Sequence, residues 1–504
     1  MPARTSSPAR RARSPRASPR PKNGGANGGA NGGANGGANG GHKSANGEAT
    51  AYAFDDEPMQ FGGTVGALFI MLFSHALLYY LYLSLELHGG ALFVPTELSR
   101  YAAFLAEHAV PTASEVGVYA AFIALQTFLA LVLPGLVLPG LPVRSLGGKR
   151  LDYNCNGWAA WVVTQLIVAS LHFSGTFSVE WAADHYGALL TTMVCTGDAV
   201  ALAVYAAGFL PRVPGEGHAG AFRRERMTGS HVYDFFMGAS LNPRFGGPRA
   251  GGLDIKMWAE VRVSWITLFL LTLSAATKAA SERGGEVGAS FWIMLMAHWL
   301  YTNACVKGEE CIITTWDIAH EKWGWMLCFW NLAGVPILYT WNCMYLLKHP
   351  AAAVPGGAAA AALLFVLYLC AYFVWDTANS QKNYFRLVLN GTYKPRPWYI
   401  FPQLPWKVIQ KPAYITTKAG TPLLVDGWWK YARKIHYTMD ICFALCWGLV
   451  CGTTHFLPYF YFCFFTGFIT HRASRDHERC AAKYGDDWRK YTQMVPYVLI
   501  PGVW

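Results

Sequence analysis

Long apolar runs recur along this chain, and they constrain its fold more than any other feature of the sequence. A helix needs about 20 mostly apolar residues to cross the hydrocarbon core of a bilayer. Eight runs approach or exceed that length and two shorter ones follow: about 64–85, 116–138, 157–177, 187–210, 261–277, 288–304, 323–347, 356–375, 439–452 and 457–470. Hydrophobic residues make up 53% of the chain and charged residues only 14%, which is typical of membrane proteins. The sequence therefore predicts an all-α integral membrane protein with about ten transmembrane helices.

The first 55 residues differ in composition from the rest. Seven arginines and lysines lie between residues 4 and 22 without an acidic residue among them, and an Asn-Gly-Gly-Ala repeat follows. Such a segment cannot bury enough apolar surface to offset the entropy of ordering it. We therefore expect a disordered, basic, Gly- and Asn-rich tail at 1–55 and a membrane domain at 56–504. The tail carries much of the net charge of +11, so a nucleic-acid contact by the tail is an alternative role.

Two polar, charge-dense segments flank the last two apolar runs. Residues three and four apart lie on one face of a helix. If both segments are helical, each presents a stripe of aromatic rings and groups that bind phosphate or ribose: Trp429, Arg433, His436 and Tyr437 on the first, and Asp476, Cys480, Lys483 and Tyr484 on the second. Lys382 and Arg386 add two cations beyond the eighth run, and lysine and arginine bind phosphate oxygens. Residues 376–504 are therefore predicted to bind a large anionic cofactor, although an amphipathic helix at the membrane surface fits the spacing equally well.

Metal-binding and nucleophile motifs are missing from the sequence. The 12 cysteines form no CxxC pair, and several of them lie inside apolar runs. HExxH, GxSxG and a Walker lysine are also absent. We therefore expect buried thiols and no metal site.

Several longer motifs resemble a known family. The stretch HRASRDHERCAAKYGDDWRKY with VPYVLIPG, preceded by DGWWKYARKIHY, is similar to the C-terminal signature of the membrane sterol reductases. The resemblance continues through DTANSQKNYFR, NACVKGEECIITTWDIAHEKWGW, YDFFMGASLNPRFG and LDYNCNGW, and so covers the chain from about residue 60 onward. That family includes the C-14, Δ7 and C-24(28) sterol reductases and the sterol reductase domain of the lamin B receptor.

One motif separates the branches of this family. The C-14 and Δ7 enzymes typically carry Arg-His-x-Asn-Tyr where this chain has Arg433-Lys434-Ile435-His436-Tyr437. That form, with KGEECIITTWD and FPQLPW, resembles the Δ24(24(1)), or C-24(28), sterol reductase of ergosterol synthesis. The resemblance implies a multi-pass enzyme of the endoplasmic reticulum membrane that uses NADPH. By position it implies these cofactor-binding residues: Lys382, Arg386, Leu424, Trp429, His436, Tyr437, Asp476, Cys480, Lys483, Tyr484 and Tyr491.

The implied reaction also needs a proton donor. An isolated alkene does not accept hydride, so a proton must first reach the terminal carbon and leave a tertiary cation in a dry pocket. Glu309, Glu310 and Asp317 are the candidate donors, because they lie with Glu321 in one segment that also carries tryptophans, whose faces stabilise cations. Delivery of the proton by a tyrosine is the alternative.

Other functions remain open at this point. A C-14 or Δ7 sterol reductase belongs to the same family. A membrane methyltransferase of the isoprenylcysteine type has similar C-terminal helices, but its cofactor carries no phosphate for Lys382 and Arg386 to bind. A sterol-binding scaffold with a tail that contacts nucleic acid is a third alternative, yet the tail alone would give only salt-sensitive, nonspecific binding. The expected partners are a sterol and the bilayer, with no specific nucleic acid.

Overall fold

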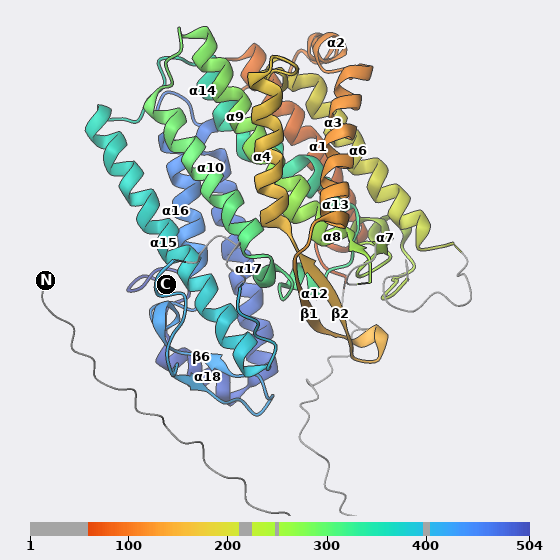
Figure 1. Cartoon of the computed structure of the whole chain (residues 1–504), viewed down its shortest axis with the longest axis vertical. Coiled ribbons are helices and arrows are strands. Elements are labelled where there is room, and N and C mark those ends of the chain that lie inside the picture. Colours follow the sequence, from red (N-terminus) through yellow and green to blue (C-terminus); the bar gives the residue numbers. More distant parts are fainter. Residues whose placement is uncertain (1–58, 211–223, 247–250, 397–403) are drawn as a thin grey trace, which may run out of the picture. The chain divides into compact units, whose positions relative to one another are not determined.

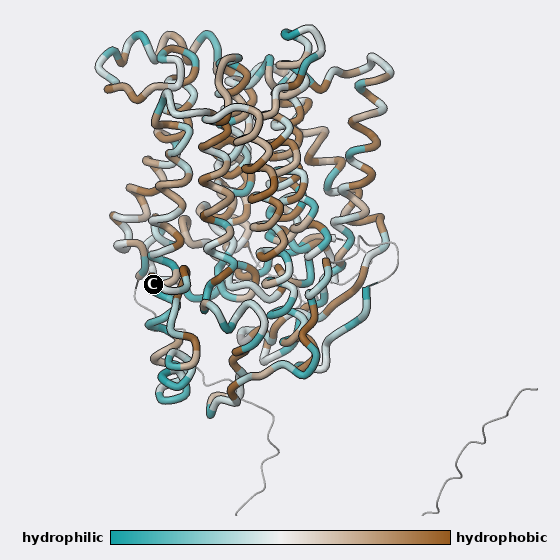
Figure 2. The backbone as a smooth tube through the Cα atoms, turned by 90° about the vertical axis from the view of Figure 1, so that its left-hand side faces the viewer, coloured by the Kyte–Doolittle hydropathy of each residue, from teal (hydrophilic) through white to brown (hydrophobic). Residues whose placement is uncertain are grey.

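The computed structural model describes residues 59–210, 224–246, 251–396 and 404–504. The tail predicted at 1–55 lies outside this part of the chain. The described part is mostly helical (Figure 1). Hydrophobic residues dominate the bundled helices, and hydrophilic residues gather in the segment that extends below them (Figure 2), where Figure 1 places β6 and α18.

The first part of the domain contains helices and one β-hairpin. Its elements are α1 (Gly63–Leu87), α2 (Leu98–His108), α3 (Ala113–Val132), β1 (Leu136–Val143), η2 (Arg144–Leu146), β2 (Lys149–Cys155), α4 (Gly157–Phe173), α5 (Trp181–Asp184), α6 (Tyr186–Ala207) and α7 (His231–Met237). Thr112 caps α3 through a capping box with Glu115, which satisfies amide groups that the first helical turn leaves free.

The middle part is irregular. It contains β3 (Arg244–Phe245), β4 (Leu253–Asp254), α8 (Ile255–Trp258), the π-helix η3 (Ala259–Ser264), α9 (Trp265–Glu282), α10 (Ala289–Lys307), α11 (Glu309–Ile312), α12 (Trp316–Ala319), α13 (Trp325–Phe329), the π-helix η4 (Trp330–Gly334) and α14 (Val335–Lys348). The two π-helices pack against each other. Short π-helical turns inside α-helices are frequent at functional sites.

The last part carries the C-terminal helices. Its elements are α15 (Gly357–Leu389), β5 (Tyr414–Ile415), β6 (Leu423–Leu424), η5 (Gly427–Lys430), α16 (Ile435–Leu449), η6 (Leu457–Tyr459), α17 (Phe460–Tyr484) and α18 (Asp486–Met494). Helix α16 packs between α15 and α17, and η5 packs on α15.

The expectation of about ten spans is only partly supported. Among the described residues, five helical stretches are long and apolar enough to cross a membrane: Gly63–Leu87, Ala113–Val132, Tyr186–Ala207, Ile255–Glu282 and Gly357–Leu389. Helices α4 and α16 are apolar but shorter. The run predicted at 323–347 is divided into α13, η4 and α14, and a side chain at Gly334 would collide there with the Trp330 ring.

The prediction of an all-α fold holds for most of the described part, which also contains three two-stranded sheets that were not predicted. The largest pairs β1 with β2, from Leu136 opposite Cys155 to Val143 opposite Lys149. The apolar run at 116–138 was expected to be one helix throughout, but the helix ends at Val132. Pro134 explains the early end, since a residue before proline is disfavoured in the helical conformation.

The first polar C-terminal segment was also wrongly predicted as a helix. Residues 427–430 form a 3-10 turn, and α16 begins only at Ile435. Gly427 has a φ of +58°, a conformation that interrupts a right-handed helix. The second segment is helical as predicted, because α17 runs without a break from the apolar residues after Phe460 to Tyr484.

Candidate cofactor site and candidate proton donors

The long helix α15 carries the two cations expected to bind phosphate. It continues fourteen residues beyond the predicted apolar run, which ended at 375, so that Lys382 and Arg386 lie one turn apart on a rigid element. Among the described residues, no carboxylate lies within ion-pair distance of either side chain. The ammonium of Lys382 instead lies 3.9 Å from the ring centre of Trp429.

Trp429 is fixed against this helix. Its buried indole donates a hydrogen bond from Nε1 to the carbonyl oxygen of Ala378 at 2.9 Å. The neighbouring Trp428 amide donates to Oε1 of Gln381 at 2.9 Å. Leu424, in β6, is buried in a small cluster with Phe385 and Trp429. These contacts hold Leu424 and Trp429 beside the residues that carry Lys382.

His436 lies in the first turn of α16 and joins the same group. Its ring centre is 5.1 Å from that of Trp429 and 4.3 Å from that of Tyr437. Its Nδ1 is buried and has no hydrogen-bond partner in the described part of the chain. A buried polar atom without a partner costs free energy, so a ligand group that bonds to His436 would be favoured here.

Asp476 lies in the polar half of α17. One carboxylate oxygen contacts the Lys434 ammonium, and the other accepts from Nη2 of Arg479 at 2.6 Å. Burial opposes ionisation, yet Lys434 and Arg479 hold the pKa of Asp476 well below its ordinary value. The Cys480 Sγ lies 3.9 Å from the carboxylate. Asp476 therefore stays ionised and its charge is already matched.

The remaining predicted cofactor residues lie around Trp488. Tyr491 and Trp488 are buried together, and Cys480 and Tyr484 pack against them. Lys483 lies with its ammonium 4.9 Å from the Tyr484 ring centre. Arg433 is part of this group and not of the His436 group, because its guanidinium lies 5.9 Å from the Trp488 ring and its amide donates to Tyr497 at 2.9 Å.

The charge balance of this region favours an anion. Four basic side chains meet here, Lys382, Arg386, Lys434 and Arg479, and the Asp476 carboxylate pairs with the last two of them. Like charges kept close together are unfavourable unless an anion compensates them. The donor set, together with the unpartnered Nδ1 of His436, fits a nucleotide that carries several phosphates.

Two of the predicted proton donors, Glu309 and Glu310, are held in ion pairs. Glu309 is buried, contacts Nη1 of Arg262 at 2.7 Å and accepts from the Gly157 amide at 2.7 Å. Burial raises the pKa of Glu309 in spite of its arginine partner. Glu310 pairs with Arg396. Both acids line a cavity of about 20 Å³, which has room for about one water molecule and not for a sterol.

Asp317 is the predicted donor that reaches the cofactor residues. Its carboxylate lies 3.6 Å from Nη2 of Arg472, on α17. The adjacent Trp316 ring lies 3.9 Å from the guanidinium of Arg479, which also binds Asp476. The structure therefore brings Asp317 next to α17, which carries four of the predicted cofactor residues.

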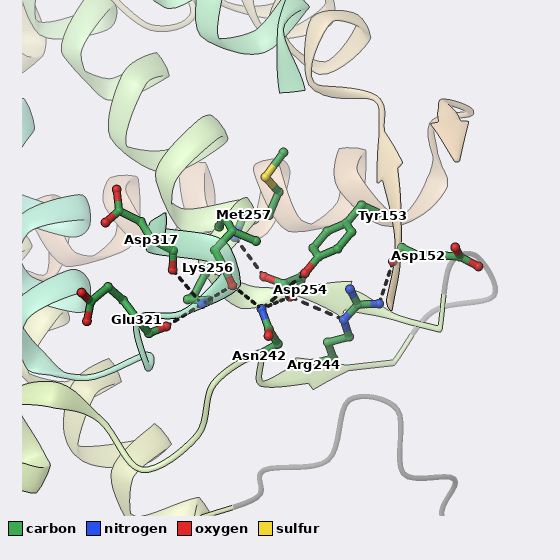
Figure 3. Close-up of polar contacts among 10 residues, drawn as sticks. Asp152, Tyr153, Asn242, Arg244, Asp254, Lys256, Met257, Asp317 and Glu321 are labelled. Carbon is green, nitrogen blue, oxygen red and sulfur yellow. Dashed lines mark hydrogen bonds and ion pairs between the residues drawn. The ribbon is translucent and has the colours of Figure 1, made fainter. Parts of the chain in front are cut away.

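Lys256 holds the segment that carries Asp317 in place. Its buried ammonium donates to the carbonyl oxygens of Asp317 and Ile318 at 2.8 Å and of Glu321 at 2.7 Å (Figure 3). The neighbouring Asn242 donates to the Ile318 carbonyl at 3.0 Å. Glu321 accepts a bond from the Trp316 indole, and burial raises its pKa.

Sequence reasoning missed Lys434, Arg479 and Trp488. The helical spacing assumed for residues 424–438 directed attention to Arg433, whose side chain lies elsewhere. Lys434 could be found only once α16 was known to begin at Ile435. Arg479 did carry a signal, because it lies three residues after Asp476 on a predicted helix, where opposite charges pair.

Comparison with known proteins matches this chain to the Ergosterol biosynthesis ERG4/ERG24 family over residues 55–504. The chain is 44% identical over 449 residues to the Delta(24(24(1)))-sterol reductase erg4A of Aspergillus fumigatus, which covers 88% of this chain and 92% of that protein. Identity to the Delta(24(24(1)))-sterol reductase of Gibberella zeae is 41% over 452 residues, covering 88% and 73%. A Delta(14)-sterol reductase of Dictyostelium discoideum is 34% identical over 456 residues, covering 88% and 92%.

A helical domain with membrane-spanning segments and this set of relatives define the class as membrane oxidoreductases of sterol synthesis. The chain belongs to the ERG4/ERG24 family of ergosterol biosynthesis, as its sequence motifs predicted.

Proposed function

We propose that this chain uses NADPH to reduce the C-24(28) side-chain double bond of a sterol in the endoplasmic reticulum membrane. Support for the side-chain bond comes from two relatives above 40% identity, both named Delta(24(24(1)))-sterol reductase. Support for the cofactor comes from one observation: Lys382 and Arg386 have no carboxylate partner among the described residues, and the Lys382 ammonium lies over the Trp429 ring. The location in the endoplasmic reticulum follows from the resemblance to that branch.

The residues around Lys382 divide the binding of the cofactor among them. Lys382 and Arg386 donate to phosphate oxygens, and Lys434 and Arg479 are oriented for the same task by Asp476. The rings of Tyr437, Tyr484 and Tyr491 offer flat faces for stacking. When bound, NADPH supplies the hydride. Leu424 and Cys480 fill space around these groups.

The chain itself must also supply a proton and exclude water from the cation that results. Glu309, Glu310 and Asp317 remain candidates for this role. Asp317 is the best placed of the three, because its arginine partner, Arg472, lies on α17 with Asp476 and Cys480. The two glutamates pair with Arg262 and Arg396 instead.

A C-14 reductase is the second candidate, since a Delta(14)-sterol reductase is also among the relatives. The test is to incubate the purified chain in lipid nanodiscs with NADPH and three sterols that carry a Δ24(28), Δ7 or Δ14 bond. The proposal expects loss of the Δ24(28) bond alone. Loss of a ring double bond alone would contradict the substrate assignment, and equal rates with NADH would contradict the choice of cofactor.

The scaffold alternative is tested by deletion of residues 1–55. The family match begins at residue 55, so the deletion leaves every candidate site residue in place. The reductase proposal expects turnover within about twofold of the full chain. Loss of all turnover would show that the tail takes part in the reaction.

A further inference from the structure

Asp440 differs from the three acids predicted as proton donors. It lies on α16, inside the apolar run predicted at 439–452. In the described part of the chain its carboxylate has no lysine, arginine or histidine within ion-pair distance, and its polar neighbour is the indole of Trp375. Glu309, Glu310 and Asp317 each face an arginine instead. An ionisable residue inside a membrane domain without a counter-ion is expensive to keep and marks a functional site.

Aromatic rings from four helices surround Asp440. The carboxylate is close enough to the hydroxyls of Tyr301, Tyr339 and Tyr461 for its charge to act on them. These tyrosines belong to α10, α14 and α17, and Trp375 belongs to α15. The rings also contact one another, with centres 5.3 Å apart for Tyr301 and Trp375 and 4.5 Å apart for Tyr339 and Tyr461. The faces of such rings stabilise a cation.

The Asp440 side chain is partly exposed, although most residues around it are buried. Asp440, Tyr301, Tyr339 and Trp375 are all partly accessible. Tyr339 keeps this surface while the residues before and after it are buried. These four side chains are therefore not sealed inside the core.

Asp440 also lies next to the residues expected to hold the cofactor. His436 is four residues earlier on α16, on the same face and about 6 Å away along the helix axis. On the neighbouring helix, Trp375 precedes Lys382 by two turns. Asp440 thus lies one helical turn from His436, toward the apolar part of α16.

We propose that Asp440 is the acid that protonates the sterol double bond, a step that rests on the proposed function. The O–H bond of the Asp440 carboxyl breaks, and the π electrons of the alkene form a C–H bond at the terminal methylene carbon. The positive charge left on the branch carbon faces the rings of Tyr301 and Trp375. That carbon accepts a hydride, with its electron pair, from a reduced nicotinamide, which is oxidised. The carboxylate then takes a proton from water.

The test compares three variants of the full chain in nanodiscs: Asp440→Asn, Tyr301→Phe and Glu309→Gln. Sterol reduction is measured in single turnovers with NADPH. Nicotinamide fluorescence reports cofactor binding, and the sterol-induced rise in Tm reports substrate binding. Loss of a general acid costs about 10²- to 10⁴-fold in rate. We expect such a loss for Asp440→Asn, with cofactor and sterol binding within about twofold of wild type.

An Asp440→Asn rate within threefold of wild type would overturn the proposal. In that case a large loss for Tyr301→Phe would assign the proton to the tyrosine, and a large loss for Glu309→Gln would assign it to the glutamate. If Asp440→Asn does not fold, Asp440→Glu decides: a displaced acid slows protonation, so the solvent deuterium isotope effect on reduction must rise, and an unchanged effect contradicts the proposal. If the wild-type chain reduces only a ring bond, the substrate assignment fails, and the same variants are tested on that sterol.

Discussion

Lys382 is the residue on which the cofactor assignment depends most. Its ammonium lies 3.9 Å from the Trp429 ring centre and has no carboxylate partner among the described residues. A charged hydrogen bond to phosphate contributes about 1.5–3 kcal/mol, so Lys382→Met should weaken NADPH binding about 10- to 100-fold. Nicotinamide fluorescence titration measures the Kd. Lys490→Met is the matched control, because Lys490 is largely exposed on α18 and pairs with Asp487. Equal losses in both variants would contradict a specific role for Lys382.

Lys322 makes stability depend on pH in a direction that can be checked. Burial lowers its pKa to about 8, even though its ammonium donates to the carbonyl oxygens of Glu225 at 3.1 Å and Arg226 at 2.9 Å. In an unfolded chain a lysine titrates near pH 10.4, so between about pH 8 and 10 the unfolded state binds the extra proton. The free energy of unfolding therefore rises with pH over this window. Below this pH window Lys322 is charged in both states, so burying it lowers the free energy of unfolding by an amount that does not depend on pH.

The variant Lys322→Met should lose that rise. The Tm of both proteins is measured at pH 7.5, 8.5 and 9.5 in one detergent. The Tm of the wild type, relative to that of the variant, should increase steadily with pH. A constant difference across this range would show that Lys322 keeps an ordinary pKa when folded.

At the scale of elements, apolar runs predicted helices well and their ends poorly. Helix α6 matches its predicted range of 187–210 closely, because no proline or glycine pair interrupts the run. Helix α15 exceeds its predicted end by fourteen residues, since hydropathy marks where a membrane ends and not where a helix does. Residues 427–434 could not be predicted from period alone, because Gly427 and the contacts of Trp428 and Trp429 with α15 break the helix there.

The site was predictable to the same degree. The α17 residues lie on one helix as their spacing required. Trp429 and His436 lie together as predicted. They do so because the turn η5 contacts α16, and not because they share one helix face. Asp440 was not among the predicted acids, and only the packing of four helices around it gives it aromatic neighbours.

The segment formed by α12 and the residues just after it depends on one buried lysine. Lys256 donates three hydrogen bonds to carbonyl oxygens of residues 317–321. Lys256→Met removes all three donors and leaves buried carbonyl groups unsatisfied, which is unfavourable. Hydrogen–deuterium exchange in residues 315–323 should therefore rise about tenfold or more. Lys278→Met, on the same helical stretch, removes a partly exposed pair with Asp184 and should leave that exchange unchanged. Equal exchange in both variants would contradict the anchoring role.

At the scale of the whole molecule, the membrane domain separates two kinds of chemistry. Cations and rings from α15, η5, α16 and α17 gather where a phosphate-bearing cofactor can bind. A carboxyl without a counter-ion lies one helical turn from His436, among aromatic rings suited to an apolar substrate and a cation. Reduction of an unactivated alkene needs both, because proton and hydride must reach neighbouring carbons from different sources.

Isotope labelling tests this account most directly. The purified wild-type chain is incubated with a Δ24(28) sterol under two conditions: NADPH deuterated at both C4 positions in ordinary water, and unlabelled NADPH in D₂O. Mass spectrometry and NMR then locate deuterium in the product. The account predicts one deuterium at C-24 from the cofactor and one on the C-28 methyl group from the solvent. The reverse placement, or solvent deuterium at C-24, would contradict protonation of the terminal carbon followed by hydride transfer.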